Sequence, residues 1–167
     1  DDALTVTYVG DTGADGVTIT GGAGAETITI TNGDNDDLVV NGGAGDDSIT
    51  LTGATGDNIE IDGGTGDDTI VGSNDGDEIT GGAGDDSITG GAGDDMLVGN
   101  AGTDTFVFSS VATNGSDTIT DFTSGTDLLD FDTILDGNTK VYEEIATDTA
   151  DITTDANVIV IGGDTTI

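Results

Sequence analysis

A nine-residue pattern that runs from Gly10 to Val107 limits the possible folds of this chain more than any other feature. Ten units begin at Gly10, Gly21, Asn32, Gly42, Thr52, Gly63, Gly72, Gly81, Gly90 and Gly99. Their sixth residues are all acidic: Asp15, Glu26, Asp37, Asp47, Asp57, Asp68, Asp77, Asp86, Asp95 and Asp104. Their eighth residues are all apolar: Val17, Ile28, Val39, Ile49, Ile59, Ile70, Ile79, Ile88, Leu97 and Phe106. One unit cannot bury its apolar side chain alone, so the units are expected to stack on one another.

The residue types within a unit indicate a turn followed by a short strand. Glycine tolerates the positive φ of a tightly curled backbone, and residues seven to nine read as a strand whose eighth side chain points inward. If two units form one coil, alternate turns lie along the same edge of a parallel solenoid. We call the edge with turns 21–26, 42–47, 63–68, 81–86 and 99–104 the first edge, and the edge with turns 10–15, 32–37, 52–57, 72–77 and 90–95 the second edge. The first edge is near consensus throughout, whereas the second is degenerate until Gly90, so a regular column of ions is expected along the first edge.

The charge of the chain excludes several classes of function. Asp and Glu number 35, Lys140 is the single basic residue, His and Cys are absent, and the net charge is -34. A nucleic-acid partner or an anionic membrane requires a basic surface, and zinc, haem or iron-sulfur centres require His or Cys. Carboxylate and carbonyl oxygens instead favour calcium. Composition alone fits a disordered acidic tail, and the regular repeat argues against that reading.

The consensus of the units, G-G-x-G-x-D-x-U-x with U a large apolar residue, is met at every position by residues 81–89 and 90–98. It resembles the calcium-binding nonapeptide of RTX proteins. The resemblance implies an all-β, right-handed parallel β-roll, with calcium held between stacked turns by backbone carbonyls and sixth-position carboxylates. It implies about four to eight calcium ions for two columns of stacked turns.

The resemblance also assigns the metal ligands. The main set is Gly42, Gly43, Ala44, Gly45, Asp47, Gly63, Gly64, Thr65, Gly66, Asp68, Asp77, Gly81, Gly82, Ala83, Gly84, Asp86, Gly90, Gly91, Ala92, Gly93, Asp95, Gly99, Asn100, Ala101, Gly102 and Asp104. A weaker set is Gly21, Gly22, Gly24, Glu26, Asp37, Asp57 and Asp15. The fifth-position acids, such as Asp46, Asp67 and Asp85, are expected to face solvent.

Coil length predicts the width of the core. Successive first-edge turns begin 21, 21, 18 and 18 residues apart. The longer coils add a second inward apolar residue at Ile19, Ile30, Leu51 and Ile61, so we expect a wider core before about residue 62 and a narrower roll after it.

The segment after the repeats, Asp117 to Phe131, is similar to the segment that follows the repeats in RTX proteases, lipases and epimerases. All four phenylalanines lie between residues 106 and 131, and we expect them to cap the open end of the solenoid. The predicted division is a β-roll of about five coils in residues 1–108 and a capping segment in 109–167. Asp117, Asp121 and Asp127 are expected to be solvated turn carboxylates, with additional calcium there as the alternative.

The expected function is a calcium-binding module of a secreted bacterial surface protein, of the surface-layer or large-adhesin type, that folds on calcium binding after type I export. The alternatives are the secretion and folding module of an extracellular enzyme and an ice-binding solenoid. The chain has no transmembrane run, no amino-terminal signal peptide and no catalytic constellation, so we expect neither membrane insertion nor enzymatic activity. The expected partners are calcium, copies of the chain or neighbouring domains of a larger surface protein, and no nucleic acid.

Overall fold

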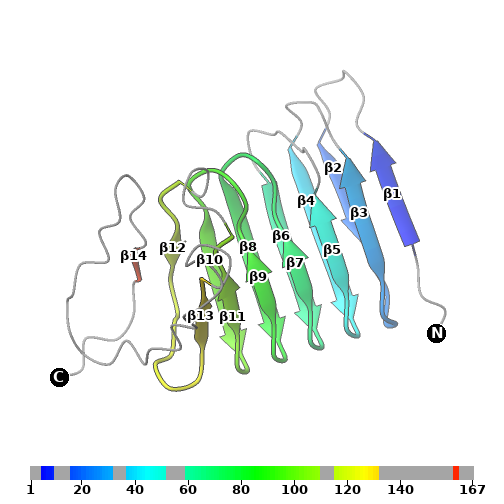
Figure 1. Ribbon diagram of the computed structural model, residues 1–167. Helices are drawn as coiled ribbons and strands as arrows, with labels where there is room; N and C mark the ends of the chain where they lie inside the picture. The colour runs from blue at the N-terminus through cyan, green and yellow to red at the C-terminus, as the bar shows by residue number, and fades with distance from the viewer. Residues whose placement is uncertain are drawn as a thin grey trace.

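The computed structural model describes residues 5–9, 16–31, 37–51, 59–109, 115–131 and 160–161. The regular elements in these ranges are β-strands, arranged as a stack of parallel coils (Figure 1). In the described part of the chain, no helix has the length and apolar character needed to cross a membrane.

The strands form two parallel sheets, and the chain alternates between them. The odd-numbered sheet contains β1 (Thr5–Val9), β3 (Thr27–Thr31), β5 (Ser48–Leu51), β7 (Thr69–Val71), β9 (Ser87–Thr89), β11 (Thr105–Val107) and β13 (Leu128–Asp130). The even-numbered sheet contains β2 (Val17–Thr20), β4 (Leu38–Ala44), β6 (Ile59–Thr65), β8 (Asp77–Ala83), β10 (Met96–Ala101), β12 (Thr118–Ile119) and β14 (Val160–Ile161). Each strand pairs with the strands two places away in the chain, so two units form one coil, and the predicted all-β parallel solenoid is confirmed. Its right-handedness stays a prediction.

The first edge is the lower edge in Figure 1, where each even strand turns into the next odd strand. The second edge lies opposite, where odd strands lead into even ones. The predicted pairing of alternate turns along one edge is therefore confirmed, because Ser48 pairs with Thr69, and Thr69 with Ser87.

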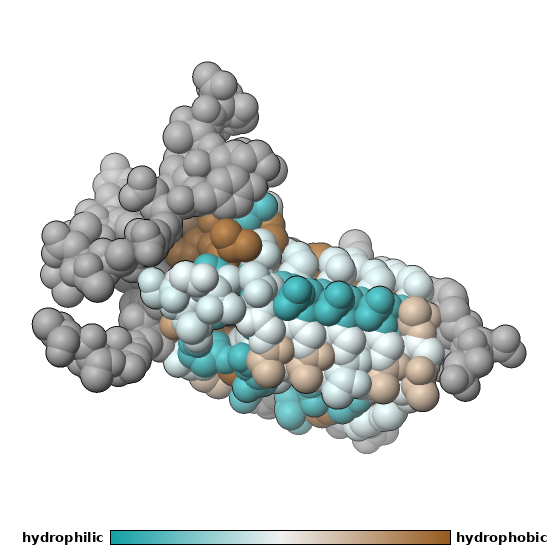
Figure 2. Space-filling view, turned by 90° about the horizontal axis from the view of Figure 1, so that it is seen from below, coloured by the Kyte–Doolittle hydropathy of each residue, from teal (hydrophilic) through white to brown (hydrophobic). Residues whose placement is uncertain are grey.

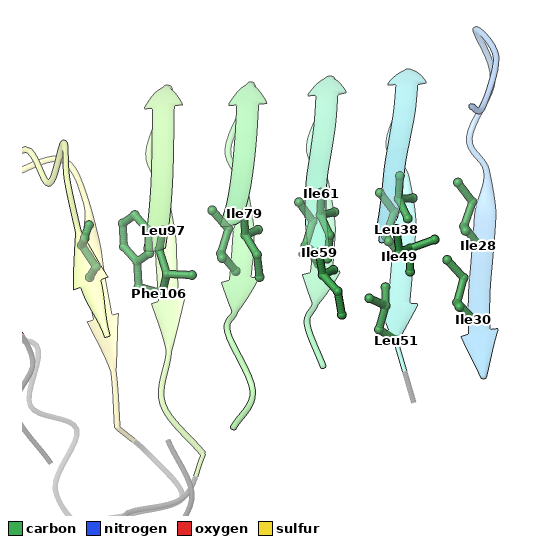
Figure 3. Packing of buried hydrophobic residues seen from close by; sticks show 14 of the residues in the cluster. Ile28, Ile30, Leu38, Ile49, Leu51, Ile59, Ile61, Ile79, Leu97 and Phe106 are labelled. Carbon is green, nitrogen blue, oxygen red and sulfur yellow. The ribbon is translucent and has the colours of Figure 1, made fainter. Parts of the chain in front are cut away.

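The core is a ladder of apolar side chains between the two sheets (Figure 3). On the odd sheet Ile28, Ile49, Ile70, Ile88 and Phe106 are in register, and each is fully buried. The even sheet contributes one or two apolar residues per strand opposite them. Burying one such side chain contributes roughly 1.5 to 3 kcal/mol, so stacking supplies what a single unit lacks.

The longer coils have the expected second layer of core residues. Ile30, Leu51 and Ile61 are buried, and Ile19 is partly buried against the same cluster. The three-residue strands β7, β9 and β11 have a single buried residue each, so the core narrows along the chain as predicted.

The expectation that Val39 points inward is wrong. Its side chain is 37% exposed, whereas Leu38 and Val40 are buried. Leu38 pairs with Val17 and Ile59, and Val40 pairs with Ile19 and Ile61. Side chains alternate along a strand, so a shift of one residue moves every side chain to the other face. Each neighbouring coil has two inward apolar residues, Val17 and Ile19 in one and Ile59 and Ile61 in the other. Strand pairing with these residues, and not the nine-residue spacing, determines which side chains of β4 point inward.

The four phenylalanines gather as two ring pairs beyond β9. Phe106 and Phe122 have centroids 6.3 Å apart, and Phe108 stacks on Phe131 at 5.1 Å. Phe106 and Phe108 are buried, while Phe122 and Phe131 pack partly buried against the cluster. Their assignment as the cap of the solenoid stays a prediction.

Candidate metal centre

Five of the turns have a positive φ at their second and fourth positions. In the 63–68 turn, Gly64 and Gly66 have φ values of 107° and 122°, a region that L-residues rarely adopt. The second and fourth positions of turns 42–47, 81–86, 90–95 and 99–104 lie in the same region, with Asn100 in place of glycine in the last of these. Turns 21–26 and 72–77, both fully described, contain no residue with a positive φ.

The sixth-position carboxylates tie each coil to the one before it. On the first edge, the Asp47 N–H donates to Oδ1 of Asp68 at 2.7 Å, and the Asp68 N–H donates to Oδ1 of Asp86 at 2.8 Å. The same bond joins Glu26 to Asp47, Asp86 to Asp104, and Asp104 to Asp127. On the second edge it joins Asp77 to Asp95 and Asp95 to Asp117. Asp47, Asp68, Asp86, Asp95, Asp104, Asp117 and Asp127 thus each use Oδ1 to accept an N–H from the preceding coil.

One carboxylate oxygen is buried and has no hydrogen-bond partner in six of these residues. The six atoms are Glu26 Oε2 and the Oδ2 atoms of Asp47, Asp68, Asp86, Asp95 and Asp104. Their side chains are at most 3% exposed. A buried ionised oxygen without a donor or a cation costs several kcal/mol, so an ion-free fold is unfavourable at these positions.

The turns are shaped around these oxygens. A Cβ on Gly63 would lie 2.5 Å from Oδ2 of Asp68, and a Cβ on Gly42 would lie 2.5 Å from Oδ2 of Asp47. Only glycine therefore leaves room beside the unpartnered oxygen. A Cβ on Gly64 or Gly66 would collide with a backbone carbonyl of the preceding coil, so carbonyl oxygens also crowd the space between turns.

Burial raises the pKa of these carboxyls. It raises the pKa of Asp68 to about 6, of Asp86 to about 7 and of Asp95 to about 8, with repulsion from neighbouring carboxylates adding to the effect. The pKa values of Asp47 and Asp104 are raised for the same first reason. Without a cation, the column therefore holds its charge against desolvation and mutual repulsion.

The donor set fits a hard cation that accepts many oxygen ligands. In the described ranges, no three acidic side chains converge to form a site by themselves. A cation here would combine the sixth-position carboxylates with turn carbonyls, which suits calcium, since calcium takes six to eight oxygens in flexible geometry. The unpartnered oxygens and the glycine-lined space beside them fit this ion.

The predicted acidic ligands differ in where they lie. Glu26, Asp47, Asp68, Asp86 and Asp104 line up along the first edge, and Asp77 and Asp95 along the second. Asp37 is exposed, unlike the others. Asp15 and Asp57, with most of their turns, lie outside the described residues. The ligand role of each residue stays a prediction.

The fifth-position acids form a separate, outward row. Asp46, Asp67 and Asp85 are exposed as predicted, and hydrophilic side chains run in a row along this edge in Figure 2. Their Oδ1 atoms accept N–H groups from the following coil, as in the 2.8 Å bond from Asp85 to Asp67. The fifth-position carboxylates therefore accept N–H groups from the following coil, whereas the sixth-position carboxylates accept them from the preceding coil.

Asp117 and Asp127 extend the two columns beyond the nine-residue units. Asp117 accepts the Asp95 N–H at 3.1 Å and is 3% exposed, so the expectation of a solvated carboxylate is wrong there. Asp127 accepts the Asp104 N–H at 3.2 Å, and Asp121 accepts the Gly99 and Asn100 N–H groups. The acidic-x-apolar step of the units recurs at Asp117-Thr118-Ile119 and Asp127-Leu128-Leu129, a signal that could have identified both residues.

Comparison with known families supports the calcium assignment. Residues 71–106 match the family described as the RTX calcium-binding nonapeptide repeat (4 copies). No curated protein and no solved structure matches the chain. The matched region spans turns of both edges, 72–77 and 90–95 on one and 81–86 and 99–104 on the other.

Proposed function

We propose that this chain, which carries RTX calcium-binding repeats in residues 71–106 and folds as a β-roll, is a calcium-gated folding module of a secreted bacterial surface protein. The observation that carries the proposal is the set of six buried carboxylate oxygens without a partner. Each needs a cation or a proton before the coil that holds it becomes stable.

Stacking and ion binding depend on each other in this architecture. A sixth-position carboxylate meets its counterpart only when the next coil is in place, as the bond from Asp68 to Asp86 illustrates. A complete site therefore exists only in the folded chain, and the free energy of ion binding contributes directly to folding. Ions also reduce the self-repulsion of a chain with a net charge of -34.

The same coupling suits export. At the low calcium concentration of a cytosol the chain stays extended and can pass through a type I secretion channel. Outside, calcium at about 10⁻⁴ to 10⁻³ M, the range that extracellular modules typically bind, drives folding.

A calcium titration followed by far-ultraviolet circular dichroism tests the proposal. We expect an unstructured chain in chelator at pH 8 and a cooperative gain of β signal as calcium rises, with magnesium much less effective because it resists dehydration. A chain with the same β signal in chelator and in millimolar calcium would refute calcium gating.

We assign the host to the surface-layer or large-adhesin class, and no catalytic role to this chain. The chain supplies rigid, calcium-dependent stacking and no basic surface, which suits a structural module. The alternative is the carrier module of an extracellular protease, lipase or epimerase, which the Asp117 to Phe131 segment favours. A zinc-protease or nucleophile-elbow motif in the same reading frame upstream of Asp1 would establish the carrier alternative.

A second candidate, ice or surface binding, is favoured by the outer face of the odd sheet. Thr27, Ser48, Thr69, Ser87 and Thr105 are in register and form one row of hydroxyl side chains. The outward residues from β3 to β11 carry no charge, whereas the even sheet exposes Glu60 and Glu78. Thermal hysteresis of the calcium-loaded protein tests this candidate, and its absence at millimolar protein would eliminate ice binding.

A further inference from the structure

Asp77 differs from the other buried sixth-position carboxylates of the nine-residue units because both of its oxygens have protein donors. Its Oδ2 accepts the Ser73 N–H at 2.7 Å, and its Oδ1 accepts the Ser73 hydroxyl at 3.0 Å. The Asp77 side chain is 4% exposed and Ser73 is 3% exposed, so this is a buried pair within one turn. Asp95, one coil further along the same edge, keeps an unpartnered Oδ2.

The register between coils also changes at Asp77. Asp95 accepts the N–H of Asp77 from the coil before it. Asp77 is itself paired with Ile59, because the unit that begins at Thr52 is two residues longer than the unit that begins at Gly72. The donors to the Asp77 carboxylate come from Ser73 in the same turn, whereas Asp95 and Asp86 each accept a backbone N–H from the preceding coil.

The backbone of the 72–77 turn also differs from that of the next turn on the second edge. Ser73 occupies the second position, where the next second-edge turn has Gly91 with φ 116°. Ser73 is outside the positive-φ region, and its Oγ accepts the Asp75 N–H at 3.1 Å. The turn is therefore closed by hydrogen bonds among Ser73, Asp75 and Asp77, with a backbone unlike that of the consensus turns.

We infer that Ser73 takes the place of a calcium ion in the 72–77 turn, so that Asp77 is not a calcium ligand and the second-edge ions in the described region begin at Asp95. The inference rests on the proposed calcium binding and revises the sequence-based assignment of Asp77. It gives the middle of the solenoid one turn that closes without metal. The sequence cue is Ser at the second unit position, together with a change from a 21-residue to an 18-residue coil.

Calcium stoichiometry measured by native mass spectrometry at saturating calcium tests the inference. The wild-type chain is compared with Asp77→Asn, Asp95→Asn and Ser73→Ala. We expect Asp77→Asn and Ser73→Ala to bind as many ions as the wild type, and Asp95→Asn to bind at least one fewer. The Asp77→Asn amide still accepts the Ser73 N–H, so this variant keeps a closed turn even if Ser73→Ala folds poorly.

The outcomes separate the two proposals. An ion lost in Asp77→Asn or in folded Ser73→Ala, or a full complement of ions in Asp95→Asn, overturns the inference and leaves calcium gating intact. A wild-type chain that binds no calcium overturns the proposed function itself.

Discussion

Acid should replace calcium as the trigger of folding. The ion-free fold buries carboxyl groups whose pKa values are raised from 3.8 by desolvation, to about 7 for Asp86 and about 8 for Asp95. A folded-state pKa above the unfolded value means that the folded chain binds more protons between these values. Stability of the ion-free fold is therefore lost as the pH rises from about 4 to 8 and is regained on acidification.

The size of the effect follows from these two groups. Each side chain is only 2% exposed, so solvent screens the burial cost little. Above pH 8, ionising them in the ion-free fold costs about 4 kcal/mol for Asp86 and about 6 kcal/mol for Asp95. Lowering the pH from 8 to 5 therefore stabilises the ion-free fold by about 6 kcal/mol from the two groups together, and somewhat more than half of this comes from Asp95. The free energy of unfolding of a small domain is about 5 to 15 kcal/mol, so this change is enough to decide whether the chain folds.

The assay is circular dichroism in calcium-depleted buffer between pH 8 and pH 5. We expect β signal to appear on acidification, and in saturating calcium we expect a signal that changes little over the same range. In the unfolded chain, carboxyls have pKa values near 4 and are mostly ionised above pH 5, so this window measures proton uptake by the folded state. The Asp95→Asn variant, already neutral at that position, should fold at a higher pH than the wild type. An ion-free chain that is equally unfolded at pH 8 and pH 5 would contradict the reasoning.

Three further predictions concern single side chains. Asp86→Asn should raise the calcium midpoint of folding about tenfold, a loss of about 1.4 kcal/mol, whereas Asp85→Asn, an exposed neighbour, should stay within about twofold in the same titration. Ile79→Ala should lower the free energy of unfolding in saturating calcium by about 2 to 5 kcal/mol, because Ile79 is fully buried. Met96→Ala, at a 39% exposed position on the same sheet, should change it by less than about 0.5 kcal/mol, and equal losses in urea melts would contradict the assigned core. Gly84→Ala should lower the melting temperature markedly, since Gly84 has φ 137° and its Cβ would collide with a carbonyl of the preceding coil; an unchanged melt would show that this turn relaxes freely.

The repeat was sufficient to predict the architecture because each unit has an apolar side chain to bury and a carboxylate whose charge must be neutralised. An apolar residue such as Ile49 every nine to eleven residues and a carboxylate such as Asp47 two positions earlier admit few arrangements other than stacked coils. Pairing of alternate turns, the narrowing core and the outward fifth-position acids such as Asp67 all followed from the order of residues, and the described strands confirm them.

Register was harder to predict than repetition. Val39 satisfied the spacing rule and yet points outward, because the apolar pairs of the neighbouring coils align Leu38 and Val40 with the core. Asp117 lies outside the units and yet occupies a sixth position, because the stack presents the Asp95 N–H to it. Both outcomes depend on which residue of the next coil lies opposite, which the spacing within one coil does not specify.

Residue order alone therefore establishes that this chain is a solenoid with acidic turns suited to calcium, since period, charge and glycine placement are local properties. Which carboxylates need an ion is a property of the stack. Asp86 and Asp77 occupy the same position in the repeat, but the coil above Asp86 presents the N–H of Asp68 and leaves one oxygen unpartnered. The carboxylate of Asp77 accepts instead from Ser73 of its own turn, which donates to both oxygens. The donors that reach each carboxylate decide between the two, and these donors are known only once the turns are folded and the coils are stacked.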